Sequence, residues 1–421
     1  MSAKKLCAGA GSAELKFPKE YFPTHEHYDR ILDPLHCKAL LVEGEGSICI
    51  ISMELPSLKP YTLIDEMKEL VHDLTGYETE NIWIGMTHNM AAPHVPPAEA
   101  KDGKFEIHVR VVREAITEAV EKAKKHLTQA LVGTGCGEAY INVNRDFETR
   151  EGWWLGVEGT GPSDKAVTVL RFDDLEGNPL AVLFTYACKS SVLEDSFDPN
   201  GMRRVTSEVS GRACQYVEKR LHAPVLYFMA DGGDQVPRKK ANYYSKDQDG
   251  HIIEVNHYDE GAGWMEEQAV KLGKSVLETV QTIVCGEMGF MSVDQVDLTY
   301  PGQKSFPKGL LKDGPRRTYE YLPDDPQTVQ FDLFCINDLA IIGSKPEITS
   351  ITGMELRRLS PFTHTTIATM INGGFNYMAD ASVYDRFLFE GTHSMFWKGA
   401  AERFVQDMTG ILTKIRKGDA G

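Results

Sequence analysis

The sequence predicts an α/β fold in which mixed β-sheets have central strands flanked by helices. Short apolar runs recur along the 421 residues, and segments with helical periodicity lie between them. Several of these runs are apolar on both faces, as expected of central strands that are covered on both sides. The chain is long enough to build a large hydrophobic core.

Six apolar runs are predicted to form strands, and an Asn337-Asp338 turn predicts a further pair of strands within 328–343. The six runs are 37–43, 47–53, 81–86, 166–172, 179–188 and 223–229.

Apolar residues spaced three or four positions apart predict four helices. The first covers 63–74 and stops at Gly76, a residue typical of helix C-termini. The others cover 112–127, 270–283 and 404–415. We expect two long loops, at 146–165 and at the charged segment 237–262, where loops often form the rim of a binding site.

Charge and composition narrow the class of partner. The 45 basic and 61 acidic residues give a formal charge of 45 − 61 = −16, which opposes binding to nucleic acid or to anionic membranes. The longest apolar run, 180–188, is too short to span a bilayer. With no visible signal segment and eight scattered cysteines, we expect a cytoplasmic protein that binds a small-molecule substrate. Homo-oligomerisation stays open.

Polar residues stand where predicted strands end, which is where α/β proteins bind ligands. His88 follows 81–86, Lys189 ends the apolar run 179–188, Asp234 follows 223–229, and Glu347 follows 328–343. A buried amine such as Lys189 needs a carboxylate partner or a lowered pKa. Each residue also has an ordinary explanation, as a packed histidine, a solvated lysine or a turn.

Taken in order, these segments resemble the N-terminal catalytic domain of the neutral/alkaline, non-lysosomal ceramidase family. The resemblance runs from "AGAGSAELKFP" to "GTHSMFWKG" and rests on an ordered set of motifs. It implies one α/β domain over residues 1–421, without the C-terminal immunoglobulin-like domain of ceramidases.

Several functional positions of the family are retained. The resemblance implies that His88 in "THNMAAP", Glu347 and Tyr377 occupy zinc-ligand positions. It also implies that Arg145 in "VNRD" binds substrate and that Asp234 in "FMADGGD" matches the family's aspartate.

Other positions depart from the family. Lys189 in "TYACKSS" replaces the second zinc histidine, Met90 replaces a histidine of the catalytic centre, and Ala230 replaces the nucleophilic serine. Ceramide hydrolysis is therefore not expected.

We expect a hydrolase of a C–N bond, of amide or lactam type, in a small polar substrate. In one mechanism His88, Glu347 and Tyr377 hold zinc, which activates water. Asp234 or His94 then moves the proton, and Arg145 grips a substrate carboxylate. The further substrate contacts expected are Asn89, Met90 and Trp153.

A second mechanism has no metal. The Lys189 ammonium takes the place of the ion beside Glu347 and Tyr377 and acts as an electrophile, a base or a Schiff-base amine. That chemistry suits a lyase, an isomerase or a metal-free hydrolase. A third interpretation is an inactive relative that binds a small ligand.

Overall fold

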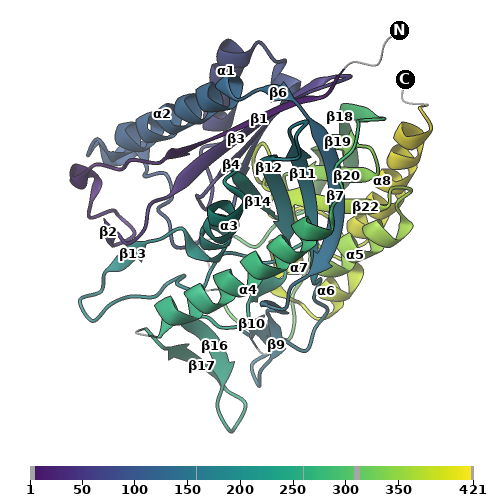
Figure 1. Ribbon diagram of the computed structural model, residues 1–421. Coiled ribbons are helices and arrows are strands. Elements are labelled where there is room, and N and C mark those ends of the chain that lie inside the picture. Colours follow the sequence, from purple (N-terminus) through teal and green to yellow (C-terminus); the bar gives the residue numbers. More distant parts are fainter. Residues whose placement is uncertain (1–4, 158, 259, 308–312, 419–421) are drawn as a thin grey trace.

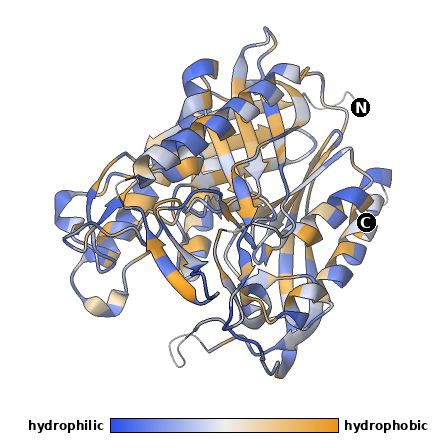
Figure 2. Cartoon of the chain, turned by 90° about the horizontal axis from the view of Figure 1, so that it is seen from below, coloured by the Kyte–Doolittle hydropathy of each residue, from blue (hydrophilic) through white to orange (hydrophobic). Residues whose placement is uncertain are grey.

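Three mixed β-sheets surround a common hydrophobic core, and each sheet is covered on its outer side by a pair of helices (Figure 1). The computed structural model describes residues 5–157, 159–258, 260–307 and 313–418. The central core takes Leu40 and Ile50 from the first sheet, Leu183 and Leu226 from the second, and Ile341 from the third. Figure 2 shows the same arrangement, with apolar strands inside and hydrophilic helix faces outside. The predicted α/β class is confirmed.

The first sheet has the strand order β5-β4-β3-β1-β6, in which only β4 and β5 are parallel. Helices α1 and α2 pack on it because Gly11 in β1 lets α2 approach closely. A Cβ at Gly11 would lie 2.2 Å from the Ala119 carbonyl oxygen. The elements are β1 (Cys7–Glu14), β3 (His36–Glu43), β4 (Ser47–Met53), β5 (Ile82–Met86), β6 (Thr128–Gln129), α1 (Thr62–Thr75) and α2 (Lys104–Lys125).

The second sheet has the order β14-β12-β11-β7 with one parallel pair, β12 and β14. Its outer face packs against α3 and α4. The elements are β7 (Leu131–Glu138), β11 (Ala166–Asp173), β12 (Pro179–Tyr186), β14 (Val225–Met229), α3 (Glu208–Leu221) and α4 (Gly261–Thr282).

The third sheet has the order β18-β19-β20-β22, with β20 and β22 parallel, and it packs against α5 and α8. The predicted turn between two strands is confirmed, because Asn337 joins β19 to β20 with a φ of 48°. The elements are β18 (Met291–Gln303), β19 (Pro323–Ile336), β20 (Leu339–Ser344), β22 (His364–Thr369), α5 (Ser350–Leu359) and α8 (Ala400–Lys417).

The two segments expected to be loops contain regular structure, so that expectation was wrong in part. Within 146–165, β10 (Trp153–Leu155) pairs with β9 (Asp146–Glu148), and within 237–262, β16 (Asn242–Lys246) and β17 (Ile252–Asn256) form a hairpin. Figure 1 shows this hairpin projecting from the body of the protein near α4. The remaining short elements are β2 (Tyr28–Ile31), β8 (Asn142–Asn144), β13 (Arg203–Val205), β15 (Gln235–Pro237), β21 (Glu347–Ile348), β23 (Tyr377–Met378), α6 (Ala381–Asp385), α7 (Phe389–His393) and the short 3-10 turns Lys19–Tyr21, Thr79–Asn81 and Ala98–Ala100.

Two global features bear on the expected environment of the protein. All eight cysteines are free thiols. Across the described ranges, no helix combines the length and the apolar character that crossing a membrane requires.

Candidate functional site

A pocket of about 310 Å³ lies where the segments after β5, β12 and β20 meet. Four of the residues singled out in the sequence line it together: His88, Lys189, Glu347 and Tyr377. They are far apart along the chain, and the ends of buried strands bring them to one place. We call this space the inner pocket.

Backbone pairing fixes the positions of these side chains. The Ser190 amide donates to the His88 carbonyl at 3.3 Å, and the Met90 amide donates to the Ser190 carbonyl at 2.8 Å, which ties the segment after β5 to the segment after β12. Glu347 and Tyr377 are direct partners in the parallel pairing of β21 with β23. Met90 itself lines the inner pocket.

Lys189 and Glu347 form a buried ion pair at the centre of the pocket. Lys189 Nζ lies 2.8 Å from Glu347 Oε2 and donates to the Tyr377 hydroxyl at 3.1 Å. The two charged side chains are only 7% and 12% exposed. Burial favours the neutral amine, but the Glu347 carboxylate outweighs it and raises the pKa of Lys189.

The same contacts keep Glu347 ionised. Burial alone would raise the pKa of this carboxyl, but the Lys189 ammonium, followed by His88 and Arg145, outweighs burial and lowers it. At neutral pH the centre of the pocket therefore holds a full ammonium–carboxylate pair.

His88 is a neutral imidazole at the edge of this pair. Its Nε2 lies 3.7 Å from Glu347 Oε1, and its Nδ1 faces the Met370 sulfur at 2.7 Å. Burial lowers the pKa of His88 to about 4, so the ring is uncharged at neutral pH. A neutral imidazole beside a carboxylate can accept a proton and be stabilised once charged.

Arg145 is fixed in the pocket wall by Glu390, a residue that the sequence did not single out. Arg145 Nε donates to Glu390 Oε1 at 2.7 Å, and the guanidinium lies over the rings of Phe389 and Tyr377, at 5.2 and 5.4 Å from their centres. Burial is outweighed by Glu390, which raises the pKa of Arg145 further. Glu390 carries no local signal of its role, because it is a lone acid in the apolar stretch "FLFEGTH".

Asp234 does not line the inner pocket. Its carboxylate accepts hydrogen bonds from the Ser350 amide at 3.0 Å, the Ser350 hydroxyl at 2.8 Å and Asn144 at 2.9 Å. Burial, followed by the charge of Glu390, raises the pKa of Asp234 to about 6. Its backbone carbonyl accepts from the Arg145 amide at 2.9 Å, so the geometry fits a positioning role better than a proton-transfer role.

The other sequence candidates divide into two groups. His94 lines the pocket at its rim, where its Nδ1 pairs with Glu26 at 2.7 Å. Asn89 is fully buried and turned to the Glu54 and Thr206 carbonyls. Trp153 packs in a small apolar cluster under the Arg386 guanidinium. Leu155, two residues further along the chain, lines the pocket instead.

The pocket wall carries more positive than negative charge. Four cations line it, Lys59, Arg145, Lys189 and Lys345, against two carboxylates, Glu194 and Glu347, which gives 4 − 2 = +2 with neutral histidines. The chain as a whole has a formal charge of −16. Lys189 and Arg145 already pair with Glu347 and Glu390, so Lys59 and Lys345 are the lining cations that would meet an anionic ligand.

The donor set does not fit a resident zinc ion. Within the described ranges, no group of three or more His, Cys, Asp or Glu side chains is placed to hold a metal. The ligand positions of the family resemblance also hold an ammonium, 2.8 Å from the carboxylate that a cation would need. A divalent ion beside Lys189 would meet strong repulsion.

Comparison with solved structures defines the fold. The chain has the fold of neutral ceramidases, which confirms the expected ceramidase-like architecture. It is similar to the crystal structure of neutral ceramidase from Pseudomonas aeruginosa, with a TM-score of 0.72 and 15% identity, over 98% of this chain and 75% of that chain. A ceramidase complexed with C2 gives a TM-score of 0.71 and 14% identity, over 98% and 76%. No family model and no curated protein sequence matches the chain.

Proposed function

We propose that the protein is a hydrolase of a C–N bond, of amide or lactam type, in a small anionic substrate other than ceramide. The Lys189 ammonium replaces a metal cation in this reaction. The observation that carries the proposal is the buried contact of Lys189 with Glu347 and Tyr377 in an electropositive pocket. The ceramidase fold supports a hydrolase, since those neighbours are named for cleavage of an amide.

The chemistry needs a place for negative charge. When water attacks an amide carbonyl, the carbonyl oxygen becomes an oxyanion, and fixed donors in a water-poor site stabilise it. The Lys189 ammonium and the Tyr377 hydroxyl are such donors, and Glu347 fixes the ammonium in place. His88, which is neutral because burial lowers its pKa to about 4, accepts the proton of the attacking water and passes it to the leaving amine. Glu347, 3.7 Å away, stabilises the imidazolium in between.

The charge of the wall indicates the class of substrate. Lys59, Lys345 and Arg145 favour a carboxylate on the substrate, and a charged wall disfavours the burial of an alkyl chain. A base or Schiff-base role for Lys189 needs the neutral amine, and the raised pKa of Lys189 opposes it. We therefore favour hydrolysis over the lyase or isomerase alternative.

The test uses protein treated with a chelator and a panel of N-acylglycines and carboxylated lactams, with amine release followed by NMR. We expect turnover without added metal and a loss of at least about 100-fold in Lys189→Met and in His88→Ala. Lys239→Met is the matched control, because Lys239 pairs with Glu267 on the protein surface. Activity that depends on added metal, or full activity of Lys189→Met, would contradict the proposal. Binding without any product would favour the inactive, ligand-binding alternative.

A further inference from the structure

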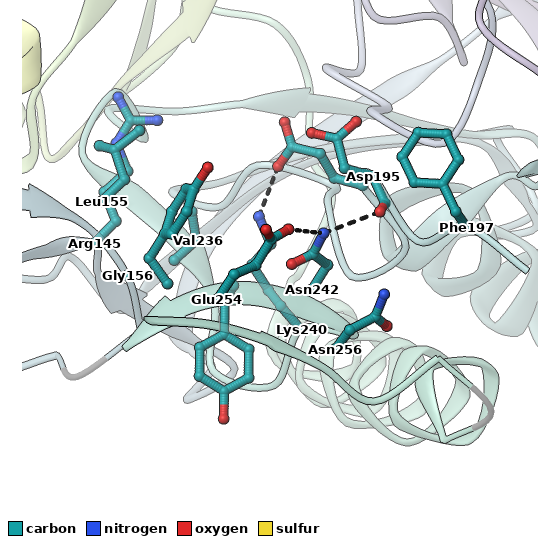
Figure 3. Close-up of a pocket in the computed structure, with 13 residues that line it drawn as sticks. Arg145, Leu155, Gly156, Asp195, Phe197, Val236, Lys240, Asn242, Glu254 and Asn256 are labelled. Carbon is teal, nitrogen blue, oxygen red and sulfur yellow. Dashed lines mark hydrogen bonds and ion pairs between the residues drawn. The ribbon is translucent and has the colours of Figure 1, made fainter. Parts of the chain in front are cut away.

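A second compartment adjoins the inner pocket. It has a volume of about 410 Å³ and shares three wall residues with the inner pocket: Arg145, Leu155 and Glu194. Its far side is built by the β16–β17 hairpin and by the segment that follows Lys189 (Figure 3). We call it the outer compartment. The shared wall residues place the two spaces side by side.

The charge of the outer compartment is opposite to that of the inner pocket. Three carboxylates line it, Glu194, Asp195 and Glu254, against two cations, Arg145 and Lys240. Both cations already have carboxylate partners. Lys240 Nζ lies 2.6 Å from Glu194 Oε2, and Arg145 is paired with Glu390.

Of the two remaining carboxylates, Asp195 already pairs with Arg203 at 3.6 Å, so Glu254 is the carboxylate that a ligand would pair with. Glu254 accepts a hydrogen bond from Asn242 at 2.9 Å (Figure 3). The Asp195 side chain is 64% exposed.

Aromatic rings complete the wall. Phe197, Tyr243 and Tyr244 line the compartment with the carboxylates. Carboxylates and aromatic faces together favour an ammonium group, which gains both ion pairing and cation–π attraction, and they disfavour a second carboxylate.

From this we infer that the substrate has two charged ends, with an anionic group in the inner pocket and an ammonium group in the outer compartment. The inference rests on the proposed function in one respect, which is that the scissile amide lies between the two charged ends. The substrate class is then a small zwitterionic amide, whose ammonium group belongs either to the acyl group or to the leaving amine.

Three matched probes test it: γ-aminobutanoyl-glycine, γ-hydroxybutanoyl-glycine and succinyl-glycine. They share the glycine carboxylate and the amide and differ in the distal group, which is cationic, neutral or anionic. Affinity is measured by calorimetry with the Lys189→Met protein and by competition with the wild type, so that binding is separated from turnover. We expect the amine probe to bind at least about fivefold more tightly than the hydroxyl probe, and succinyl-glycine to bind most weakly.

A charge reversal in the outer compartment sharpens the test. Glu254→Lys is expected to reverse the order, so that succinyl-glycine binds more tightly than the amine probe. Glu66→Gln, an exposed acid on α1, is the control and should leave the order unchanged. Equal affinities, or an order that Glu254→Lys leaves intact, would overturn the inference even if the probes are hydrolysed. The expected order without hydrolysis would uphold it and reject the proposed reaction.

Discussion

Removal of the Lys189 amine should destabilise the protein by leaving a buried carboxylate without its partner. In Lys189→Met, Glu347 loses its ammonium partner at 2.8 Å and retains the neutral His88 ring at 3.7 Å and the more distant Arg145 charge. Both members of the original pair are almost fully buried. Breaking such a pair from one side costs about 3 kcal/mol of unfolding free energy at neutral pH. The double variant Lys189→Met/Glu347→Gln has neither charge of the pair, so we expect it to regain about 2 kcal/mol of unfolding free energy relative to Lys189→Met.

The loss should also depend on pH. In the wild type, Glu347 has a lowered pKa, so its contribution to stability is present at neutral pH and is lost as pH falls through that pKa. In Lys189→Met the pKa of Glu347 is expected to rise above its unfolded value, so protonation stabilises the variant as pH falls. The difference between the two proteins should therefore shrink in acid.

Urea unfolding followed by circular dichroism, at neutral and at acidic pH, measures both effects. Lys345→Met is the matched control, because Lys345 lines the same pocket and forms no ion pair with a described residue. A loss below about 0.5 kcal/mol in Lys189→Met, or a double variant as unstable as the sum of its parts, would refute the reasoning.

Three further predictions follow from single side chains. For any substrate that is turned over, kcat/KM should fall as pH decreases through about 4, because His88 acts as a neutral base and burial lowers its pKa to about 4. A fall of kcat/KM centred at about pH 6.5, the ordinary histidine value, would contradict this role. In the folded protein the pKa of Asp234 is about 6, which is above the value of about 4 in the unfolded chain. Between these two pH values the folded state binds more protons than the unfolded state, so the free energy of unfolding falls as pH rises from about 4 to about 6. Asp234→Asn should remove that fall in urea titrations, and an unchanged pH profile would count against it. Tyr61 and Gly374 both line the inner pocket. Gly374→Ala would place a Cβ 2.2 Å from the Tyr61 hydroxyl, so the ring must move and KM should rise with kcat little changed. An unaltered KM would reject a role of Tyr61 in shaping the site.

Much of the fold could be predicted because its signals are local. The apolar strands and the helices with large buried residues, such as α1 and α8, are visible as periodicity. Helix α3 was missed because its buried face mixes small or polar residues, such as Ser210 and Gly211, with a few aliphatic ones, such as Val217. The β16–β17 hairpin was missed, although β17 carries Ile252, Ile253 and Val255, because both strands are short, only partly buried and set in a charged segment.

The site could be predicted in part for the same reason. Side chains directly after buried strands must gather at a sheet edge, and this applies to His88, Lys189 and Glu347. Tyr61, which lines the pocket, and Glu390, which holds Arg145 in its wall, could not be found this way, because they lie outside strand ends and are brought to the site by the packing of distant segments. Asn89 shows the opposite error. It is next to the pocket residue His88 in the sequence, but its side chain donates hydrogen bonds to buried backbone carbonyls.

The central claim is that Lys189 is a permanently charged ammonium held by Glu347. The most direct measurement is the pH titration of the Lys189 side chain by NMR in protein with ¹³C-labelled lysine, with the signal assigned from its loss in Lys189→Arg. The account predicts that this signal stays in the ammonium form at neutral pH and that its titration midpoint lies above the ordinary lysine value of about 10.4 expected of surface residues. A midpoint near about pH 7 to 8 would show a neutral amine at working pH, and the electrophile role of Lys189 would be wrong.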